Sequence, residues 1–255
     1  MTRLDLPPLT PAEYLAADEV LLDSCEADLG DETLIFWEPR RTFVVVGYAN
    51  KVHSEVNVAV CDAQDVPIFR RCSGGGTIVQ MPGGLNYSLI LRIEEDGPTR
   101  NIAATNQFVM AKNRAAIESL FLKSEIANRE LEIAVCGHTD LALVTHRDSR
   151  VTIQKFSGNA QRRRKNFLLF HGTFLLDCDL AGIGDLLRMP SSQPDYRASR
   201  PHSEFVTNLN LPATAVKTCL AEAWKAAEQL PNPPLEEIKN LAFEKYSTHE
   251  WNFKF

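Results

Sequence analysis

Four apolar runs follow one another closely in the second half of the chain, and their spacing restricts how the chain can fold. They cover residues 131–135, 141–145, 151–156 and 167–176. Their lengths and their apolar, partly β-branched composition favour strands. The segments between them are too short for a crossover helix, so neighbouring runs can pair only as antiparallel hairpins. The pattern therefore predicts an antiparallel sheet in this part of the chain.

Helical segments lie before and after these runs. Thr10, Pro11 and Glu13 fit a capping box with proline at the first helical position, and Gly30 is a suitable stop. A long helix with one apolar side is predicted over residues 101–121. Three more helices are expected, at 180–188, 213–229 and 234–246. Short strands are expected at 33–37, 42–46, 66–69, 77–79 and 85–93. With no convincing linker, we predict a single α+β domain over residues 1–255.

Composition excludes several classes of protein. Hydrophobic residues are 44% and charged residues 24% of the 255 residues, which is typical of a packed core rather than a disordered chain. A formal net charge of −6 gives no reason to expect nucleic-acid binding. Residues 1–8 lack an apolar core of signal-peptide length, and no stretch is long enough to span a bilayer. The six cysteines form no CxxC pair, so we expect reduced thiols in the cytoplasm.

The segment 70–77 reads RRCSGGGT and follows a predicted strand. Three glycines let the backbone turn and approach a ligand without hindrance from a β-carbon. Exposed N–H groups in such a turn could hold a phosphate or carboxylate, and the two arginines would add positive charge. The segment matches neither a Walker loop nor GxGxxG. Its alternative interpretation is a glycine-rich hairpin with solvated arginines.

The segment 155–161 reads KFSGNAQ, and the basic run RRRK follows at 162–165. Lys155 is expected at the end of a strand, before a Ser-Gly turn, where its charge could balance a bound phosphate or carboxylate. The alternative is an ordinary exposed lysine. The basic run predicts a solvated loop, and the less common alternative is a docking patch for an acidic partner.

Two more polar positions stand out in the predicted sheet. His171 interrupts the apolar run 167–176, where a histidine is more often a hydrogen-bonded core residue than a catalyst. Gly172 marks a close approach of the backbone. Asp140 precedes the run 141–145 and either caps a turn or anchors a ligand.

The order and spacing of these segments resemble the lipoate–protein ligase A family, within the biotin/lipoyl ligase superfamily. The match includes RRCSGGG at 70–76, a looser HTDL at 138–141, KFSGNAQ at 155–161, HGT at 171–173 and VTNL at 206–209. EVN at 55–57 and EWNF at 250–253 also look like family positions. The resemblance covers roughly residues 13–255.

The resemblance implies a mixed, largely antiparallel central sheet flanked by helices, related to the catalytic cores of class II aminoacyl-tRNA synthetases and biotin ligases. It implies an enzyme that uses ATP, usually with Mg²⁺, to convert lipoate to lipoyl-AMP. The lipoyl group would then pass to a lysine of a lipoyl carrier domain. The carrier would be the E2 component of a 2-oxoacid dehydrogenase or the H-type protein of the glycine-cleavage system.

The same resemblance assigns the site residues. Lys155 matches the family's active-site lysine, which contacts the adenylate and the lipoyl carbonyl. Asp140 matches an acidic position that contacts the adenylate or organises the metal, so Mg²⁺ could bind through Asp140 and phosphates. The other residues expected to bind substrate or adenylate are Arg71, Ser73, Gly74, Gly75, Gly76, Ser157, Gly158, Asn159, Ala160, His171 and Gly172.

The sequence departs from the family pattern in two places. Gln80 stands where a histidine is usual, which affects the expected acyl recognition. Typical bacterial ligases continue after the WNF element with a small accessory domain, whereas this sequence stops at Phe255. We therefore expect a catalytic domain without that accessory domain, which a separate small subunit could supply.

Other functions stay open. An octanoyl or lipoyl transferase would use an acyl-carrier thioester or preformed lipoyl-AMP, and the thioester route needs a nucleophilic cysteine. We expect Cys72, Cys136 and Cys178 to be buried as small apolar side chains instead. A non-catalytic lipoyl-AMP-binding protein would keep the same motifs. A biotin ligase normally carries a GRGRxGR-like loop, which is absent here.

Overall fold

The computed structural model describes residues 1–124, 131–147, 150–190 and 192–255. The strands of a large sheet are β1 (Thr2–Asp5), β2 (Thr33–Trp37), β6 (Gly84–Arg92), β7 (Leu131–Cys136), β8 (Asp140–Arg147), β9 (Arg150–Arg163), β10 (Phe167–Leu175) and β11 (Glu228–Gln229). A smaller sheet contains β3 (Phe43–Val46), β4 (Ile68–Arg70) and β5 (Ile78–Gln80). The α-helices are α1 (Pro11–Glu26), α2 (Val52–Glu55), α3 (Val58–Ala63), α4 (Ile102–Leu122), α5 (Ile183–Leu186), α6 (His202–Phe205), α7 (Ala213–Trp224), α8 (Leu235–Leu241) and α9 (His249–Asn252).

In the described residues the large sheet has the strand order β11-β1-β2-β6-β10-β9-β8-β7, and the smaller sheet has the order β4-β3-β5. In the large sheet β1 pairs in parallel with β2 and β11, and the other pairs are antiparallel. The predicted fold class, a mixed and largely antiparallel sheet flanked by helices, is confirmed. No helix in these residues is both long and apolar enough to cross a membrane.

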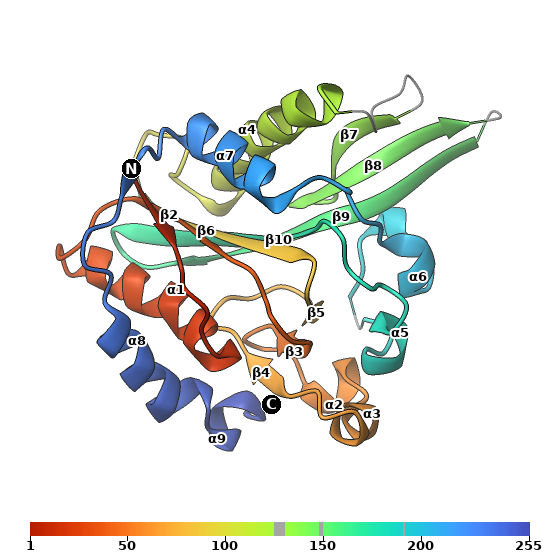
Figure 1. The fold of residues 1–255 in the computed structure, drawn as a ribbon, viewed down its shortest axis with the longest axis horizontal. Coiled ribbons are helices and arrows are strands. Elements are labelled where there is room, and N and C mark those ends of the chain that lie inside the picture. Colours follow the sequence, from red (N-terminus) through yellow and green to blue (C-terminus); the bar gives the residue numbers. More distant parts are fainter. Residues whose placement is uncertain (125–130, 148–149, 191) are drawn as a thin grey trace.

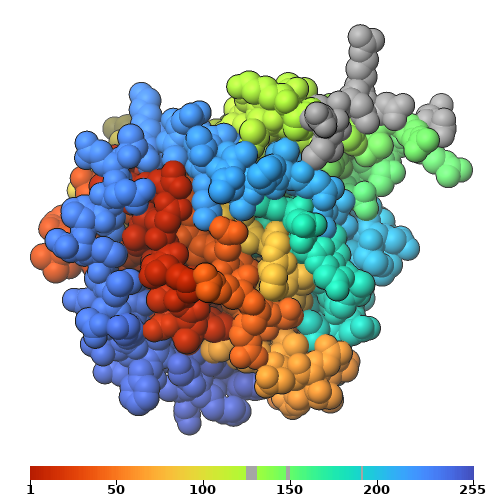
Figure 2. All heavy atoms as spheres, in the orientation of Figure 1, coloured from red at the N-terminus to blue at the C-terminus, as the bar shows by residue number. Residues whose placement is uncertain are grey.

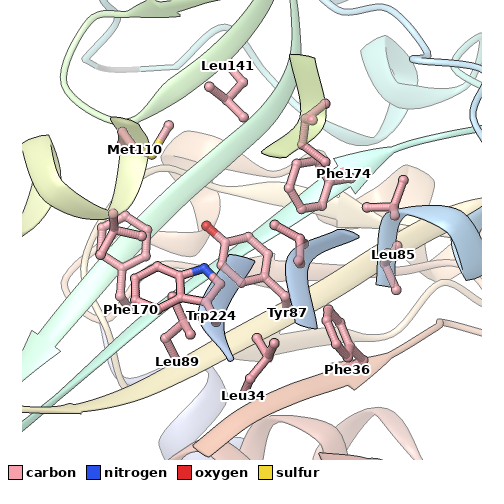
Figure 3. Close-up of a cluster of buried hydrophobic side chains, with 14 of the residues drawn as sticks. Leu34, Phe36, Leu85, Tyr87, Leu89, Met110, Leu141, Phe170, Phe174 and Trp224 are labelled. Atoms are coloured by element: carbon pink, nitrogen blue, oxygen red, sulfur yellow. The ribbon is translucent and has the colours of Figure 1, made fainter. Parts of the chain in front are cut away.

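Helices cover the large sheet on both faces (Figure 1). Strands alternate their side chains between the two faces. Phe170 and Phe174 of β10 pack with Val109 and Met110 of α4, on a side that we call the α4 face. Figure 3 shows this core, with Trp224 of α7 beside Tyr87 of β6.

The opposite side, which we call the α1 face, carries the alternate residues of the same strands. Leu169 of β10 packs there in one core cluster with Leu15 and Leu22 of α1. The predicted capping box of α1 is confirmed, because Thr10 and Glu13 exchange side chain-to-backbone hydrogen bonds. The smaller sheet lies on this side as well, and Figure 2 shows the red and orange N-terminal segments packed against the blue C-terminal helices.

The structure corrects the prediction for β9. The strand does not end at Phe156 before a turn but continues to Arg163, because β10 pairs with every residue from Ser157 to Arg163. Lys155 therefore lies inside a strand. The basic run is also not a wholly solvated loop. Arg162 donates to the Cys72 carbonyl at 2.6 Å, and Arg163 donates to the Thr99 carbonyl at 2.8 Å.

Helix bounds differ from the predictions near the end of the chain. The helix expected at 180–188 is the single turn α5. The helix expected at 213–229 ends at Trp224, because Lys225 adopts a left-handed conformation with φ of 54°, and residues 228–229 form β11 instead. The helix expected at 234–246 is α8 followed by a π-helical turn at 242–246. β1 was not predicted. It forms because it pairs with β2 along one edge and with β11 along the other.

Candidate active site

Several of the predicted site residues lie together on the α1 face of β8, β9 and β10. Asp140 is paired with Gly158, and Ala160 is paired with His171. Lys155 is three residues from Gly158 and would face the other side of a regular strand. A register shift between Leu141 and Ala142 inserts a β-bulge, so Lys155 pairs with Ala142 and joins the α1 face.

The Lys155 ammonium is held by an acidic partner. Its Nζ atom lies 2.8 Å from Asp140 Oδ1, and the two side chains are 25% and 14% exposed. Tyr196 donates its hydroxyl to the other carboxylate oxygen, Asp140 Oδ2, at 2.7 Å. Burial and then the Asp140 charge raise the pKa of Tyr196, so its hydroxyl stays a donor. The main chain of Lys155 is fixed by Thr207, whose N–H donates to its carbonyl at 2.9 Å.

The glycine turn lies over the same face. Gly75 has φ of 88°, a conformation that favours glycine, and a β-carbon there would lie 3.4 Å from Ala160 Cβ. Gly47 allows the turn to approach, because a β-carbon at Gly47 would come within 2.1 Å of the Gly75 carbonyl oxygen. Positions that β-carbons of Gly74 and Gly76 would occupy have nothing within 4 Å, so this side of the turn is open.

Arg71 shapes the turn from within. Its Nη2 donates to the carbonyls of Gly74 and Gly76 at 2.6 and 2.7 Å. Burial lowers the pKa of Arg71 to about 10, which still leaves the guanidinium charged at neutral pH. In a planar trans peptide the C=O and the following N–H point in opposite directions. The N–H groups of Gly75 and Thr77 therefore point away from Arg71.

Arg70 does not add charge to this turn, contrary to one expectation for the two arginines. It is fully buried and donates to backbone carbonyls at 2.8–3.0 Å. The carbonyls belong to Gly47, Tyr48, Asn50, Trp251 and Asn252. Arg70 thus joins the C-terminal EWNF segment to the strand that precedes the turn.

Ser73 connects the turn to helix α1. Its Oγ lies 2.6 Å from His171 Nε2, and His171 Nδ1 lies 2.6 Å from Asp18 Oδ2. Ser88 donates to the other Asp18 oxygen, Oδ1, at 2.6 Å. Ser73, Ser88 and Asp18 are each less than 5% exposed. His171 is therefore the hydrogen-bonded histidine that its sequence context favoured, and it lies beside the glycine turn.

Three predicted site residues, Ser157, Asn159 and Gly172, lie on the α4 face instead. Asn159 donates to the Thr139 carbonyl at 2.6 Å and accepts from the Tyr87 hydroxyl at 2.6 Å. A β-carbon at Gly172 would come within 1.7 Å of Asn159 Oδ1, so this glycine makes room for that side chain. The side chains of Ser157 and Asn159 thus lie on the side of the sheet opposite the site, and only the backbone of these residues borders the site.

Gln80 forms a closed polar cluster with Asn86 and Thr173. The Gln80 amide nitrogen donates to Asn86 Oδ1 at 2.7 Å and to Thr173 Oγ1 at 2.9 Å, and Asn86 donates back to Gln80 Oε1 at 2.9 Å. All three residues are buried. At the position where a histidine was expected, the Gln80 amide therefore forms hydrogen bonds with both buried polar neighbours.

The model of the lipoyl protein ligase A/B catalytic domain matches residues 10–224. The chain belongs to this family. Its members are enzymes, either ligases or acyl transferases.

Relatives of this lipoyl protein ligase A/B domain include both kinds of enzyme. Lipoate–protein ligase 1 of Staphylococcus aureus is 26% identical, with 95% of this chain and 70% of the relative covered. Octanoyltransferase LipM of Halalkalibacterium halodurans is 25% identical, with 96% of this chain and 95% of the relative covered. Both relatives match nearly the whole chain, so sequence similarity does not choose between ligase and transferase.

Solved structures share the fold. A bi-partite lipoate protein ligase from Thermoplasma acidophilum, described with its E2 lipoyl domain, has a TM-score of 0.74 at 23% identity, with 99% of this chain and 96% of that chain covered. A lipoate-protein ligase A bound with ATP has a TM-score of 0.71 at 22% identity, with 99% and 98% covered.

The cysteines of this family member differ in position. Cys72 and Cys178 are buried, as expected, and burial raises the pKa of Cys72 to about 12 and that of Cys178 to about 11. The expectation of burial is wrong for Cys136, which is half-buried and pairs across the β7–β8 hairpin with Asp140. Burial and the Asp140 charge raise the pKa of the Cys136 thiol.

Two polar residues of the site, Asp18 and Tyr196, were not predicted from the sequence. Asp18 follows Ala16 and Ala17 on the buried side of α1, and a carboxylate among apolar helix positions was the available signal. Tyr196 lies in a single 3₁₀ turn, Asp195–Arg197, and had no such signal.

Proposed function

We propose that the chain is an ATP-dependent lipoate–protein ligase, which forms lipoyl-AMP and transfers the lipoyl group to a lysine of a lipoyl carrier domain. One arrangement carries this proposal: the open glycine turn and the Lys155 ammonium lie on the same sheet face. Lys155 Nζ lies over Gly158, and the turn packs on Ala160. These two positions of β9 are about 7 Å apart, a span that an acyl-phosphate group can bridge.

Each half of the arrangement has a task in adenylate formation. When the lipoate carboxylate attacks the α-phosphate, negative charge increases on the phosphate oxygens. The N–H groups of Gly75 and Thr77 would bind those oxygens, as backbone nests do for anions. Lys155 would bind the acyl carbonyl and the phosphate, and would stabilise the charge that develops there in both steps.

Asp140 fits Mg²⁺ only in part. It is a single carboxylate, and both of its oxygens already have donors, Lys155 and Tyr196. In the described residues no group of three or more His, Cys, Asp or Glu side chains could hold a metal. Mg²⁺ commonly binds one or two carboxylates together with substrate phosphates. Asp140 would therefore hold Mg²⁺ jointly with ATP, and the ion would neutralise phosphate charge.

The decisive experiment follows the mass of an apo lipoyl domain incubated with the protein, ATP, Mg²⁺ and lipoate. We expect one lipoyl group per carrier and ATP–pyrophosphate exchange that depends on lipoate. Lys155→Ala should lower the rate of carrier lipoylation by about 100-fold or more without unfolding the protein. An unmodified carrier, also after addition of a candidate small accessory subunit, would reject the ligase proposal.

A second function, octanoyl transfer from an acyl-carrier thioester, is favoured by the place of Cys136 opposite Asp140. The raised pKa of this thiol disfavours it as a nucleophile, because the thiolate is the reactive form. Cys136→Ser separates the two functions. The ligase keeps its rate with serine at this position, whereas a thioester transferase loses it and needs no ATP.

A further inference from the structure

We propose that Asp18 is a positioning residue of the active site. Through His171 it sets the proton arrangement at Ser73, and this arrangement holds the glycine turn in the shape that binds the acyl-adenylate. The inference rests on the proposed function for its catalytic consequence, but its structural part does not. Asp18 lies on α1, far from the turn in sequence, and reaches it through two hydrogen bonds of 2.6 Å.

In a neutral imidazole, the hydrogen-bonding capacities of the groups fix one tautomer. The Asp18 carboxylate can only accept, so His171 Nδ1 carries a proton and donates to Oδ2. His171 Nε2 then accepts the Ser73 hydroxyl proton. This leaves the lone pairs of Ser73 Oγ free to accept from Arg71 Nε, which lies 3.1 Å away. In this series of hydrogen bonds, from Asp18 through His171 and Ser73 to Arg71, whether each group donates or accepts depends on the group before it.

Arg71 transmits this arrangement to the turn. The same Nε also donates to the Gly74 carbonyl at 3.0 Å, and Nη2 donates to the carbonyls of Gly74 and Gly76. If His171 Nε2 donated to Ser73, the Ser73 hydroxyl would have to rotate, and its proton and its remaining lone pair would both lie on the side away from His171, where Arg71 Nε binds. The bond from Arg71 would lose its alignment, and the guanidinium would shift together with the two carbonyls. The N–H groups of Gly75 and Thr77, which belong to the same peptides, would then no longer converge on one bound anion.

Ser88 makes the effect of an isosteric change predictable. It donates to Asp18 Oδ1. In Asp18→Asn the amide oxygen would remain with Ser88, and the amide NH₂ would face His171 Nδ1. Two donors cannot face each other, so the His171 proton would move to Nε2, and the imidazole would donate to Ser73. The second substitution in Asp18→Asn/Ser88→Ala removes the hydroxyl and frees the amide to flip, which should restore the original tautomer.

The test uses the whole protein and two measurements. Imidazole ¹⁵N spectra, assigned with His171→Gln, report the tautomer, and backbone amide shifts of Gly74, Gly75 and Gly76 report the turn. We expect Nδ1–H in the native protein, Nε2–H with shifted glycine amides in Asp18→Asn, and recovery of both in the double variant. The rate of lipoyl-AMP formation should fall on the order of 10- to 100-fold in Asp18→Asn and partly recover in the double variant.

Asp23→Asn is the matched control, since Asp23 lies on the same helix and its half-exposed side chain pairs with Arg164. It should change neither spectrum nor rate. A proton on His171 Nε2 in the native protein, in the Nε2–H tautomer or in the imidazolium, would overturn the proposal, and so would unchanged glycine amides in Asp18→Asn. If Asp18→Asn does not fold, Ser88→Ala replaces it and must keep the Nδ1–H tautomer. Absence of all acyl-transfer activity in the native protein would reject the proposed function alone, because both spectra still decide the role of Asp18.

Discussion

The ammonium group of Lys155 occupies the space above Gly158, where a β-carbon would lie 2.5 Å from Nζ and 2.6 Å from Cε. The lysine side chain thus runs along its own strand to reach Asp140, and a glycine three residues further on makes this path possible. The β-bulge that turns Lys155 to the α1 face and the glycine that accommodates it belong to one device.

Gly158→Ala tests this device. The atoms that would clash belong to the end of a flexible side chain, so Lys155 can move away and the fold should survive. We expect an unfolding free energy within about 1 kcal/mol of the native value. The rate of lipoyl-AMP formation should fall by about 100-fold, as for loss of one stabilising donor. Gly184→Ala is the control, because a β-carbon there meets nothing within 4 Å, and it should leave the rate unchanged.

Gly47→Ala should act on the glycine turn. The β-carbon would meet the Gly75 carbonyl, a backbone atom that cannot move alone, so the whole turn must shift. We expect ATP binding, measured by isothermal titration calorimetry, to weaken on the order of 10-fold or more. Gly182→Ala, where the added atom also meets nothing, should bind ATP as the native protein does. Equal affinities of Gly47→Ala and Gly182→Ala would mean that the turn does not hold the nucleotide.

Much of this site could be predicted because its residues lie in short sequence motifs. Lys155 and Asp140 were both assigned to the site, and they form an ion pair at 2.8 Å. The capping box of α1 was also predictable, since it depends on contacts over only three residues. Local signals of this kind need no knowledge of the rest of the fold.

Contacts between distant residues could not be predicted in this way. The Ser-Gly dipeptide at 157–158 indicated a turn, but pairing of β9 with β10 on one side and β8 on the other overrode that signal. Asp18 and His171 are 153 positions apart, and only the packing of α1 on the sheet brings them together. The side chains of Ser157 and Asn159 lie on the face opposite Lys155 because of a β-bulge, and no local sequence signal predicted that bulge.

Tyr196→Phe should separate the orientation of Asp140 from the packing around it. The substitution removes the hydroxyl that donates to Asp140 Oδ2 and keeps the ring, which packs 5.3 Å from the Phe205 ring. Because a hydrogen bond to a charged group is lost, the unfolding free energy should fall by about 1.5–3 kcal/mol. The transfer rate should fall by roughly 3- to 10-fold as Asp140 holds Lys155 less firmly. Tyr48→Phe, which removes an exposed contact with Lys254, should change stability by less than about 0.5 kcal/mol.

Glu19→Gln should make the unfolding free energy of the protein less dependent on pH in the acid range. Glu19 is buried and accepts from Lys245 Nζ at 2.5 Å and from the Tyr246 hydroxyl at 2.8 Å, so it ties α1 to the C-terminal helical segment. Burial alone would raise the pKa of Glu19, but the bonds from Lys245 and Tyr246 outweigh it and hold the pKa below the ordinary value of 4.5.

The direction of the pH effect follows from that lowered pKa. The Glu19 carboxylate stabilises the folded state fully above pH 4.5, and its contribution is lost as the pH falls through the folded-state pKa. Urea unfolding near neutral pH should show Glu19→Gln less stable by about 1–3 kcal/mol. The difference should shrink as the pH is lowered past 4.5. Glu236→Gln, at an exposed pair with Lys239, should show no such trend, and a Glu19→Gln difference that grows in acid would contradict the assigned role of the carboxylate.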